Sequence, residues 1–294
     1  MTEVLLTLPG PFQYSFMQNA YMVGAIVSLI AAAVGFFVVM RQLSFAGHAL
    51  SHIGFSGAAG AVLLGVDPLL GLLVFTLAAG LAMGLLGERV RGRDVAIGIV
   101  LAFSLGLGVL FLKLYTRYAS EVISILFGTI LGVSTTDVLL TLVLGALSLA
   151  ALVVMYRPLL FASIDPEVAE ARGVPVRMLS IAFLLVVALA VAQAVQVVGV
   201  LLIFTLLIAP PATAQYLVRR PGAAVLLAAL LALAETWIGI TLAYYWSLPV
   251  SFFISTLSCG AYVAARLVAP FLPQTRSEHP PLGVAERVVE HHLG

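Results

Sequence analysis

The chain has 294 residues, of which 62% are hydrophobic and 9% are charged, and its formal net charge is +1. Soluble domains carry about 25% charged residues, so this composition excludes a soluble globular protein, and the small net charge indicates no nucleic-acid partner. The apolar segments are continuous rather than alternating, which excludes barrel strands and predicts an all-α polytopic membrane protein in contact with lipid. The lone Cys259 excludes an internal disulfide and is interpreted as a packing residue.

Long apolar segments divide the chain into a short lead (1–13), a transmembrane domain (14–268) and a soluble tail (269–294). We expect about eight or nine spans, near 14–40, 47–65, 69–86, 95–114, 134–155, 178–198, 199–218, 223–246 and 250–268. The sequence leaves open whether both 14–40 and 47–65 cross fully. Residues 121–131 are apolar but too short to cross a hydrocarbon core of about 30 Å, and we interpret them as a re-entrant or interfacial piece.

Basic residues are distributed unevenly between the two sides of this topology. If successive spans alternate, Lys113 and Arg117 fall on one side, and the opposite side receives all the others: Arg41, Arg89, Arg91, Arg93, Arg157, Arg172, Arg177, Arg219, Arg220, Arg266, Arg276 and Arg287. Because loops rich in lysine and arginine stay in the cytoplasm, we expect a multi-pass protein of a bacterial-type cytoplasmic (inner) membrane with its C-terminus inside. A crossing by 121–131 would invert every later loop.

Residues 156–177 form the longest polar interruption before the tail. Asp165 is a plausible N-cap, Pro166 suits the first helical position, and Gly173 suits a helix C-terminus. This pattern predicts a helix of about two turns outside the bilayer. The alternative is an ordinary amphipathic connector.

Two histidines lie in an otherwise apolar stretch. His48 and His52 are four residues apart, a spacing that places both imidazoles on one face of a helix, as in zinc sites built on helices. Ser51 lies beside them. Ionisable groups at membrane depth usually mark a transport path, so the pair is the leading candidate site; the alternative is two histidines near an interface, each hydrogen-bonded to nearby backbone.

Other polar features within spans are less specific. Glu235 could bind a cation or relay protons, or it could be a packed, hydrogen-bonded group at a helix interface. Gln193 and Gln196 could line a path or form hydrogen bonds between helices. The pair Pro210-Pro211 predicts a kink or break in its span, which could border a path or only bend the scaffold.

Nucleotide and hydrolase motifs are missing from the sequence. It has no P-loop, no Gly-x-Ser-x-Gly and no His-Glu-x-x-His. We therefore expect no ATP hydrolysis by this chain itself. His279, His291 and His292 lie in the tail and are interpreted as solvated residues.

Three stretches resemble one known family. Residues 41–52, Arg-Gln-Leu-Ser-Phe-Ala-Gly-His-Ala-Leu-Ser-His, resemble the signature of permease subunits of zinc and manganese ABC importers, which typically reads Arg-x-hydrophobic-Ser/Ala-Phe-x-Gly-Asp-Ala-Leu-Ser/Ala-His. Residues 163–173 resemble that family's cytoplasmic coupling segment, which docks on the ATPase. Residues 198–214 resemble its Val-Gly-x-Leu-Leu…Pro-Ala-Ala-Thr-Ala block. The resemblance covers about 14–268 in the same order.

The resemblance implies a permease with a type II ABC importer-like fold. It also implies a second permease copy, a cytoplasmic ABC ATPase subunit, an extracytoplasmic metal-binding protein, and no permanently bound cofactor. The cargo would be a divalent transition metal. The implied residues are His48 and His52 for the metal, Ser51, Glu235 and Gln196 along the path, and Asp165, Pro166, Glu167 and Gly173 for coupling to the ATPase.

One departure from the signature concerns the metal. The family's aspartate is His48 here, whereas its histidine is kept as His52. Imidazole is a good zinc ligand and a poor ligand for hard cations, so we expect zinc first, with manganese and iron left open. Two rival functions remain: a proton-coupled secondary transporter of metal or small molecule working without an ATPase, and, with a poorer fit, an intramembrane metallohydrolase, which would need a third protein ligand. The direction of transport is also open.

Overall fold

The structure is a computed structural model that describes residues 10, 13–86, 90–114, 128 and 130–268. Within these residues every regular element is helical: α2 (Ser15–Met40), α3 (Ser44–Leu64), α4 (Pro68–Leu86), α5 (Val90–Leu114), the 3₁₀ turn η2 (Ile130–Gly132), α7 (Thr135–Ile164), α8 (Pro166–Ala171), α9 (Val176–Val198), α10 (Val200–Leu217), α11 (Pro221–Trp246) and α12 (Val250–Val268). Eight of these helices are long and apolar enough to cross a membrane; α3 is not among them. The predicted all-α polytopic fold is confirmed.

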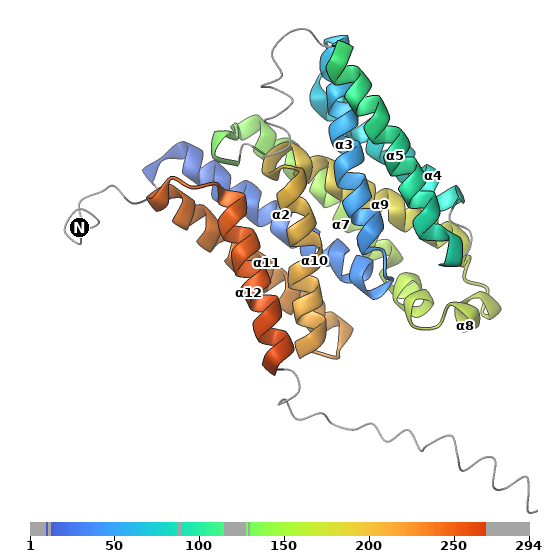
Figure 1. Ribbon diagram of the computed structural model, residues 1–294. Coiled ribbons are helices and arrows are strands. Elements are labelled where there is room, and N and C mark those ends of the chain that lie inside the picture. The colour runs from blue at the N-terminus through green and yellow to red at the C-terminus, as the bar shows by residue number, and fades with distance from the viewer. Residues whose placement is uncertain (1–9, 11–12, 87–89, 115–127, 129, 269–294) are drawn as a thin grey trace, which may run out of the picture.

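Helices α2 and α9 lie at the centre of the bundle. Helix α2 packs against α7, α9, α10 and α11, while α9 packs against α4 and α7. Helices α3, α4 and α5 form a group on one side, in contact with α9 and α10, and helices α10, α11 and α12 form another group against α2 (Figure 1). Helix α3 is therefore held by protein on several sides, which explains how a comparatively polar helix is accommodated.

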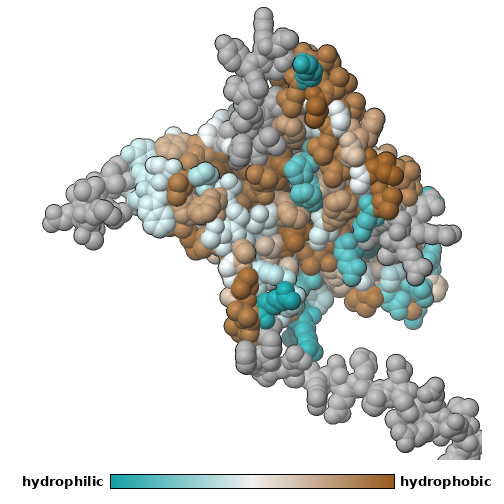
Figure 2. All heavy atoms as spheres, viewed as in Figure 1, coloured by the Kyte–Doolittle hydropathy of each residue, from teal (hydrophilic) through white to brown (hydrophobic). Residues whose placement is uncertain are grey.

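The outer surface of the bundle is strongly apolar. Large hydrophobic side chains such as Val74, Ile99, Phe103 and Val154 are exposed, and hydrophobic residues cover much of the α3–α5 group in Figure 2. In a bilayer such side chains face lipid chains, and helices suit this setting because their backbone groups are satisfied internally. Hydrophilic residues gather instead at the end of the molecule where α8 lies (Figure 2).

Glycines allow two helix pairs to approach closely. A methyl group at Gly57 of α3 would lie 2.2 Å from the carbonyl oxygen of Gly71 on α4, and one at Gly71 would lie 2.1 Å from that of Gly57. Such distances are far inside van der Waals contact, so only glycine fits at this crossing. The crossing fixes the face of α3 that packs against α4.

Pro210 and Pro211 lie inside α10, which nevertheless continues from Val200 to Leu217. The helix does not break at the prolines, and the predicted kink stays a prediction. Pro211 has no N–H for the carbonyl of Leu207, and Gly35 of α2 packs directly on that carbonyl, since a methyl group at Gly35 would lie 2.0 Å from its oxygen. Both prolines are buried, and the helix around them packs tightly against α2.

The predicted start of α7 is confirmed by a capping box. The Ser134 hydroxyl accepts a hydrogen bond from the Asp137 backbone N–H at 3.2 Å, and the Asp137 carboxylate accepts one from the Ser134 backbone N–H at 3.0 Å. The predicted end near 155 is wrong, because α7 extends to Ile164 through Pro158. Leu159 and Ala162 are buried, so their packing holds helical structure beyond the polar residues.

The short helix α8 is present as predicted. The Asp165 carboxylate accepts a hydrogen bond from the Val168 N–H at 3.0 Å, and Pro166 occupies the first turn. Gly173 has a φ of +84°, a left-handed conformation that glycine adopts without strain. Ala169 is buried while Glu167 and Glu170 are exposed, so α8 lies on the surface with one residue packed inward.

The prediction for Cys259 is wrong, because its side chain is exposed. The buried residue of this pair is Ser258, one helical step away on α12. The predicted segment 121–131 falls outside the described residues except for Gly128 and Ile130–131. The loop at 87–89, Arg117 and the tail histidines also lie outside them.

Candidate metal path

The two histidines of α3 lie against each other. Their ring centroids are 4.6 Å apart, with an angle of 72° between the ring planes. Both side chains are partly buried. The predicted placement on one face of a helix is therefore confirmed, and the two imidazoles are close enough to contact one ion.

The imidazoles are not committed to other protein groups. In the part of the chain that the structure describes, neither ring donates or accepts a hydrogen bond, and the further contact of His48 is with the ring of Phe204 on α10, at 4.8 Å between centroids. The alternative in which each histidine bonds to nearby backbone is not what the structure contains. Ring nitrogens that make no hydrogen bond are available as metal ligands.

Ser51 is close in sequence but is used differently. Its side chain is fully buried, and its hydroxyl donates to the backbone carbonyl of Gly47 at 3.0 Å, within α3 itself. Its proton thus satisfies the helix, as serine hydroxyls commonly do in apolar surroundings. Its predicted place on the path stays a prediction.

Glu235 lies in a different part of the bundle. It is 5% exposed on α11, and the hydroxyl of Ser258 on α12 donates a hydrogen bond to its carboxyl group. Helix α11 packs against α2, α10 and α12, whereas the main neighbours of α3 are α4, α5, α9 and α10. The contact with Ser258 is that of the packed, hydrogen-bonded alternative, but the second carboxyl oxygen, Oε1, is buried without a hydrogen-bond partner among the described residues. A role for Glu235 on the path stays a prediction.

The two glutamines of α9 differ in burial. Gln193 is 1% exposed, and neither polar atom of its side chain finds a hydrogen-bond partner among the described residues. Its amide end lies near Gly145 of α7, so the predicted hydrogen bond between helices is not formed. Gln196 is partly buried one turn further along α9, and its predicted place on the path is likewise untested.

A single copy of the chain supplies few metal ligands. No group of three or more His, Cys, Asp or Glu side chains comes together in the described ranges. Closed zinc sites have four ligands, so His48 and His52 of one copy suit transient passage of an ion rather than permanent retention.

Arg41, to which the sequence assigned no role, is a central residue of the structure. Its guanidinium donates to the Ser180 hydroxyl on α9 at 2.6 Å and to the Ser163 hydroxyl on α7 at 3.4 Å. It also lies over the ring of Phe183, 5.9 Å from the centroid. The sequence signals were its place directly after a span and at the start of the signature that residues 41–52 resemble, and neither indicates its distant partners.

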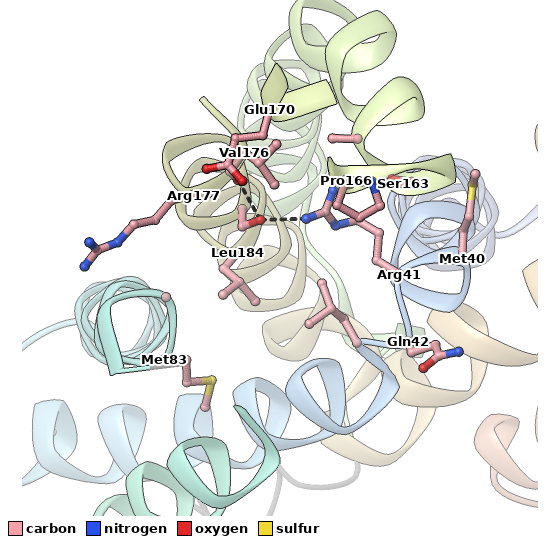
Figure 3. A pocket seen from close by; sticks show the side chains of 14 residues that line it. Met40, Arg41, Gln42, Met83, Ser163, Pro166, Glu170, Val176, Arg177 and Leu184 are labelled. Atoms are coloured by element: carbon pink, nitrogen blue, oxygen red, sulfur yellow. Dashed lines mark hydrogen bonds between the residues drawn. The ribbon is translucent and has the colours of Figure 1, made fainter. Parts of the chain in front are cut away.

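A cavity of about 540 Å³ adjoins Arg41 (Figure 3). Its lining comes from the end of α2, the end of α4, the end of α7, helix α8 and the start of α9, and includes Met40, Met83, Ser163, Pro166 and Ser180. These helix ends converge at one end of the bundle, as alternating spans require. Which end faces the cytoplasm remains a prediction.

Comparisons with known proteins agree on one family. Residues 13–269 match the family model of the ABC 3 transport family. The chain is 30% identical over 267 residues to "Manganese transport system membrane protein MntC" of Listeria innocua, covering 90% of this chain and 95% of that protein. It is 32% identical over 258 residues to a Haemophilus influenzae protein described as "Probable iron transport system membrane protein", covering 87% and 94%. Its fold matches PsaBC from Streptococcus pneumoniae with a TM-score of 0.77 and 29% identity, covering 87% of this chain and 93% of that chain.

Proposed function

The chain belongs to the ABC 3 transport family, and on that premise we propose that it is the permease subunit of an importer of divalent transition metal ions. It is a transport subunit rather than an enzyme. Relatives named for manganese and iron transport support a metal ion as the cargo. Since the sequence contains no P-loop, ATP is hydrolysed by a separate subunit.

One observation carries the proposal for the site. His48 and His52 lie 4.6 Å apart between ring centroids on a helix packed among other helices, and neither ring forms a hydrogen bond with any described residue. Both rings are partly buried and their nitrogens are uncommitted within the described residues, so both are available to a ligand that binds between them. The cargo ion provides that ligand during transport.

The preference of this permease among metal ions is proposed from the type of ligand. Imidazole binds Zn²⁺ well, whereas Mn²⁺ prefers oxygen ligands. The relatives are named for manganese and iron, and the signature that residues 41–52 resemble has an aspartate where this chain has His48. We propose that His48 shifts the preference of this permease towards Zn²⁺ within a range that also includes Mn²⁺ and Fe²⁺.

Additional ligands would come from a second copy of the chain. One copy provides two imidazoles, and no third histidine, cysteine or carboxylate joins them within the described ranges. A twofold axis beside α3 would bring two pairs together and give up to four nitrogen ligands, as structural chemistry of zinc favours. An extracytoplasmic metal-binding protein would deliver the ion.

The ATPase is proposed to dock on α8 at the cytoplasmic end. The helix is capped by Asp165, starts at Pro166 and is followed by Gly173, and Glu167 projects from its exposed first turn. Labelling of Glu167→Cys, an exposed position on α8, in a Cys259→Ser background tests the side. The background is needed because Cys259 is itself exposed, and labelling from outside intact cells would contradict this orientation.

The function is tested by reconstituting the permease with its ATPase in liposomes. We expect uptake of Zn²⁺ or Mn²⁺, supplied singly, to require ATP and the ATPase. The control is the same preparation with a non-hydrolysable ATP analogue. Uptake by the permease alone, driven by a proton gradient, would instead support the secondary transporter.

A further inference from the structure

Arg41 connects three parts of the chain that are distant in sequence. It follows the last residue of α2, and α3 with its two histidines begins at Ser44, directly after Arg41-Gln42-Leu43. Its guanidinium reaches the Ser163 and Ser180 hydroxyls at 3.4 Å and 2.6 Å. Those serines lie on either side of α8 in the chain, Ser163 near the end of α7 and Ser180 in the first turns of α9.

The two serine hydroxyls are oriented to accept from an arginine. Ser163 donates its own proton to the carbonyl of Leu159, and Ser180 donates to the carbonyl of Val176. Each oxygen therefore presents its lone pairs outward, and a guanidinium, which only donates, is the matching partner. Hydrogen bonds from a charged donor are stronger than those between neutral groups, and the ring of Phe183 adds a cation–π contact.

The same guanidinium lies beside open space. The cavity of about 540 Å³ is lined by Arg41, by Pro166 and Glu170 of α8, and by Arg177 of α9. Figure 3 shows Glu170 and Arg41 among the side chains that line this cavity. A cavity between α8 and the start of α3 provides volume into which α8 can move without colliding with a packed core.

We propose that Arg41 is a positioning residue through which movement of α8 changes the position of the histidine helix α3. A push on α8 displaces the ends of α7 and α9, the two serines carry the guanidinium with them, and the short turn Arg41-Gln42-Leu43 transmits the displacement to α3. Gln42 in that turn has a φ of +56°, a strained conformation for a residue with a side chain. This strain favours a turn that has more than one accessible arrangement.

This inference rests on the proposed function, because it assumes an ATPase that acts on α8. The test uses the complete complex of permease, ATPase and extracytoplasmic binding protein in liposomes, with Zn²⁺ and Mn²⁺ supplied singly. ATP hydrolysis and metal uptake are measured in the same vesicles, and the readout is metal ions transported per ATP. A residue that serves only stability would lower both rates together and leave this ratio unchanged.

We expect Arg41→Met to keep ATP hydrolysis while lowering the transport ratio about tenfold, the range of effects seen for residues that couple distant sites. Arg41→Lys should lose less, because it retains a positive charge but not the two-pronged geometry. Ser180→Ala removes the shorter hydrogen bond with little change in volume and should lower the ratio about threefold. The double variant Arg41→Met with Ser180→Ala should have the same ratio as Arg41→Met alone, since both substitutions disrupt one interaction.

Arg220→Met is the matched control, because it removes the same charge from an exposed arginine at the start of α11. It should leave the ratio unchanged. A wild-type ratio in Arg41→Met would overturn the inference, whether hydrolysis and uptake are both normal or both reduced. A normal ratio in Ser180→Ala would also count against it. If Arg41→Met fails to assemble, Ser180→Ala alone decides by the same criterion. A wild-type complex without ATP-dependent uptake would instead overturn the proposed function and this inference with it.

Discussion

The histidine pair of α3 and the Glu235–Ser258 pair of α11 and α12 are two ways of placing ionisable groups among apolar helices. Glu235 has a hydrogen-bond donor on the neighbouring helix. His48 and His52 have each other's rings at 4.6 Å and make no hydrogen bond to the described protein. In the first pair one carboxyl oxygen is satisfied by the fold, while Oε1 of Glu235 is buried without a hydrogen-bond partner among the described residues. In the second pair both rings are partly buried, and their nitrogens are uncommitted within the described residues.

The two pairs differ in how accessible their polar atoms are. The imidazoles are partly buried and face each other with uncommitted nitrogens, as ligands for a passing ion must be. A carboxyl that accepts from a serine across two helices stabilises their association. The proposal that cargo binds at α3, with helix packing at α11 and α12, is what the following predictions test.

The largest expected effect is that of His52→Ala. Loss of a direct metal ligand should reduce uptake at least about tenfold, since even residues that only orient ligands cost 10- to 100-fold in metal affinity. The measurement is ATP-dependent uptake of Zn²⁺ and Mn²⁺ in liposomes. Ser148→Ala is the matched control, because the buried Ser148 hydroxyl bonds only within α7, and it should retain uptake within about twofold. Normal uptake by His52→Ala in folded protein would contradict the site.

Replacements of His48 should separate ligand chemistry from packing. His48→Leu removes the ligand but keeps apolar contact with Phe204, so uptake of both metals should fall. His48→Asp replaces nitrogen with oxygen and should restore uptake while shifting preference towards Mn²⁺, because carboxylates suit harder cations. Competition between Zn²⁺ and Mn²⁺ measures the shift. Equal behaviour of wild type, His48→Asp and His48→Leu would show that His48 is only a packing residue.

Glu235 should matter less for uptake than for stability. Glu235→Gln keeps an oxygen that can accept from Ser258 and should leave uptake within about twofold. Glu235→Leu removes the acceptor and should lower the free energy of unfolding by about 1 kcal/mol, the scale of hydrogen bonds between membrane helices. Thermal unfolding in detergent measures the second effect. A large loss of uptake in Glu235→Gln would place the carboxyl on the path and break the contrast between the two pairs.

Local signals in the sequence predicted local structure well. The spacing of His48 and His52, the cap at Asp165 and the positive φ at Gly173 each depend on residues within one or two turns, and the structure contains all three. The histidines could therefore be paired before any fold was known. Whether they bind metal is a separate question, which the experiments above address.

Contacts between distant segments could not be predicted in the same way. The partners of Arg41 are on α7 and α9, and α10 stays continuous across its prolines where Gly35 of α2 packs on it. The sequence also could not show which side chains are buried inside the protein, because the lipid-facing and core-facing sides of these helices are both apolar. The sequence therefore could not distinguish buried Ser258 from exposed Cys259.

Gln193 is the intermediate case between the two pairs, and its replacement should have the smallest effect. It is 1% exposed on α9, and its amide makes no hydrogen bond to any described residue, yet no second ligand lies beside it as His52 lies beside His48. An unsatisfied buried amide costs free energy, so Gln193→Leu should keep uptake and raise the free energy of unfolding by up to about 1 kcal/mol.

Thermal unfolding and uptake of the same Gln193→Leu preparation check this prediction, with Gln196→Leu on the partly buried next turn as the matched control. If uptake by Gln193→Leu falls while stability rises, the amide holds water or cargo along a path. A buried polar side chain without a hydrogen bond would then be enough to indicate a transport site, even with no second ligand beside it. If uptake is unchanged, what distinguishes the histidine pair is that two uncommitted ligands face each other, and the assignment of the path to α3 is strengthened.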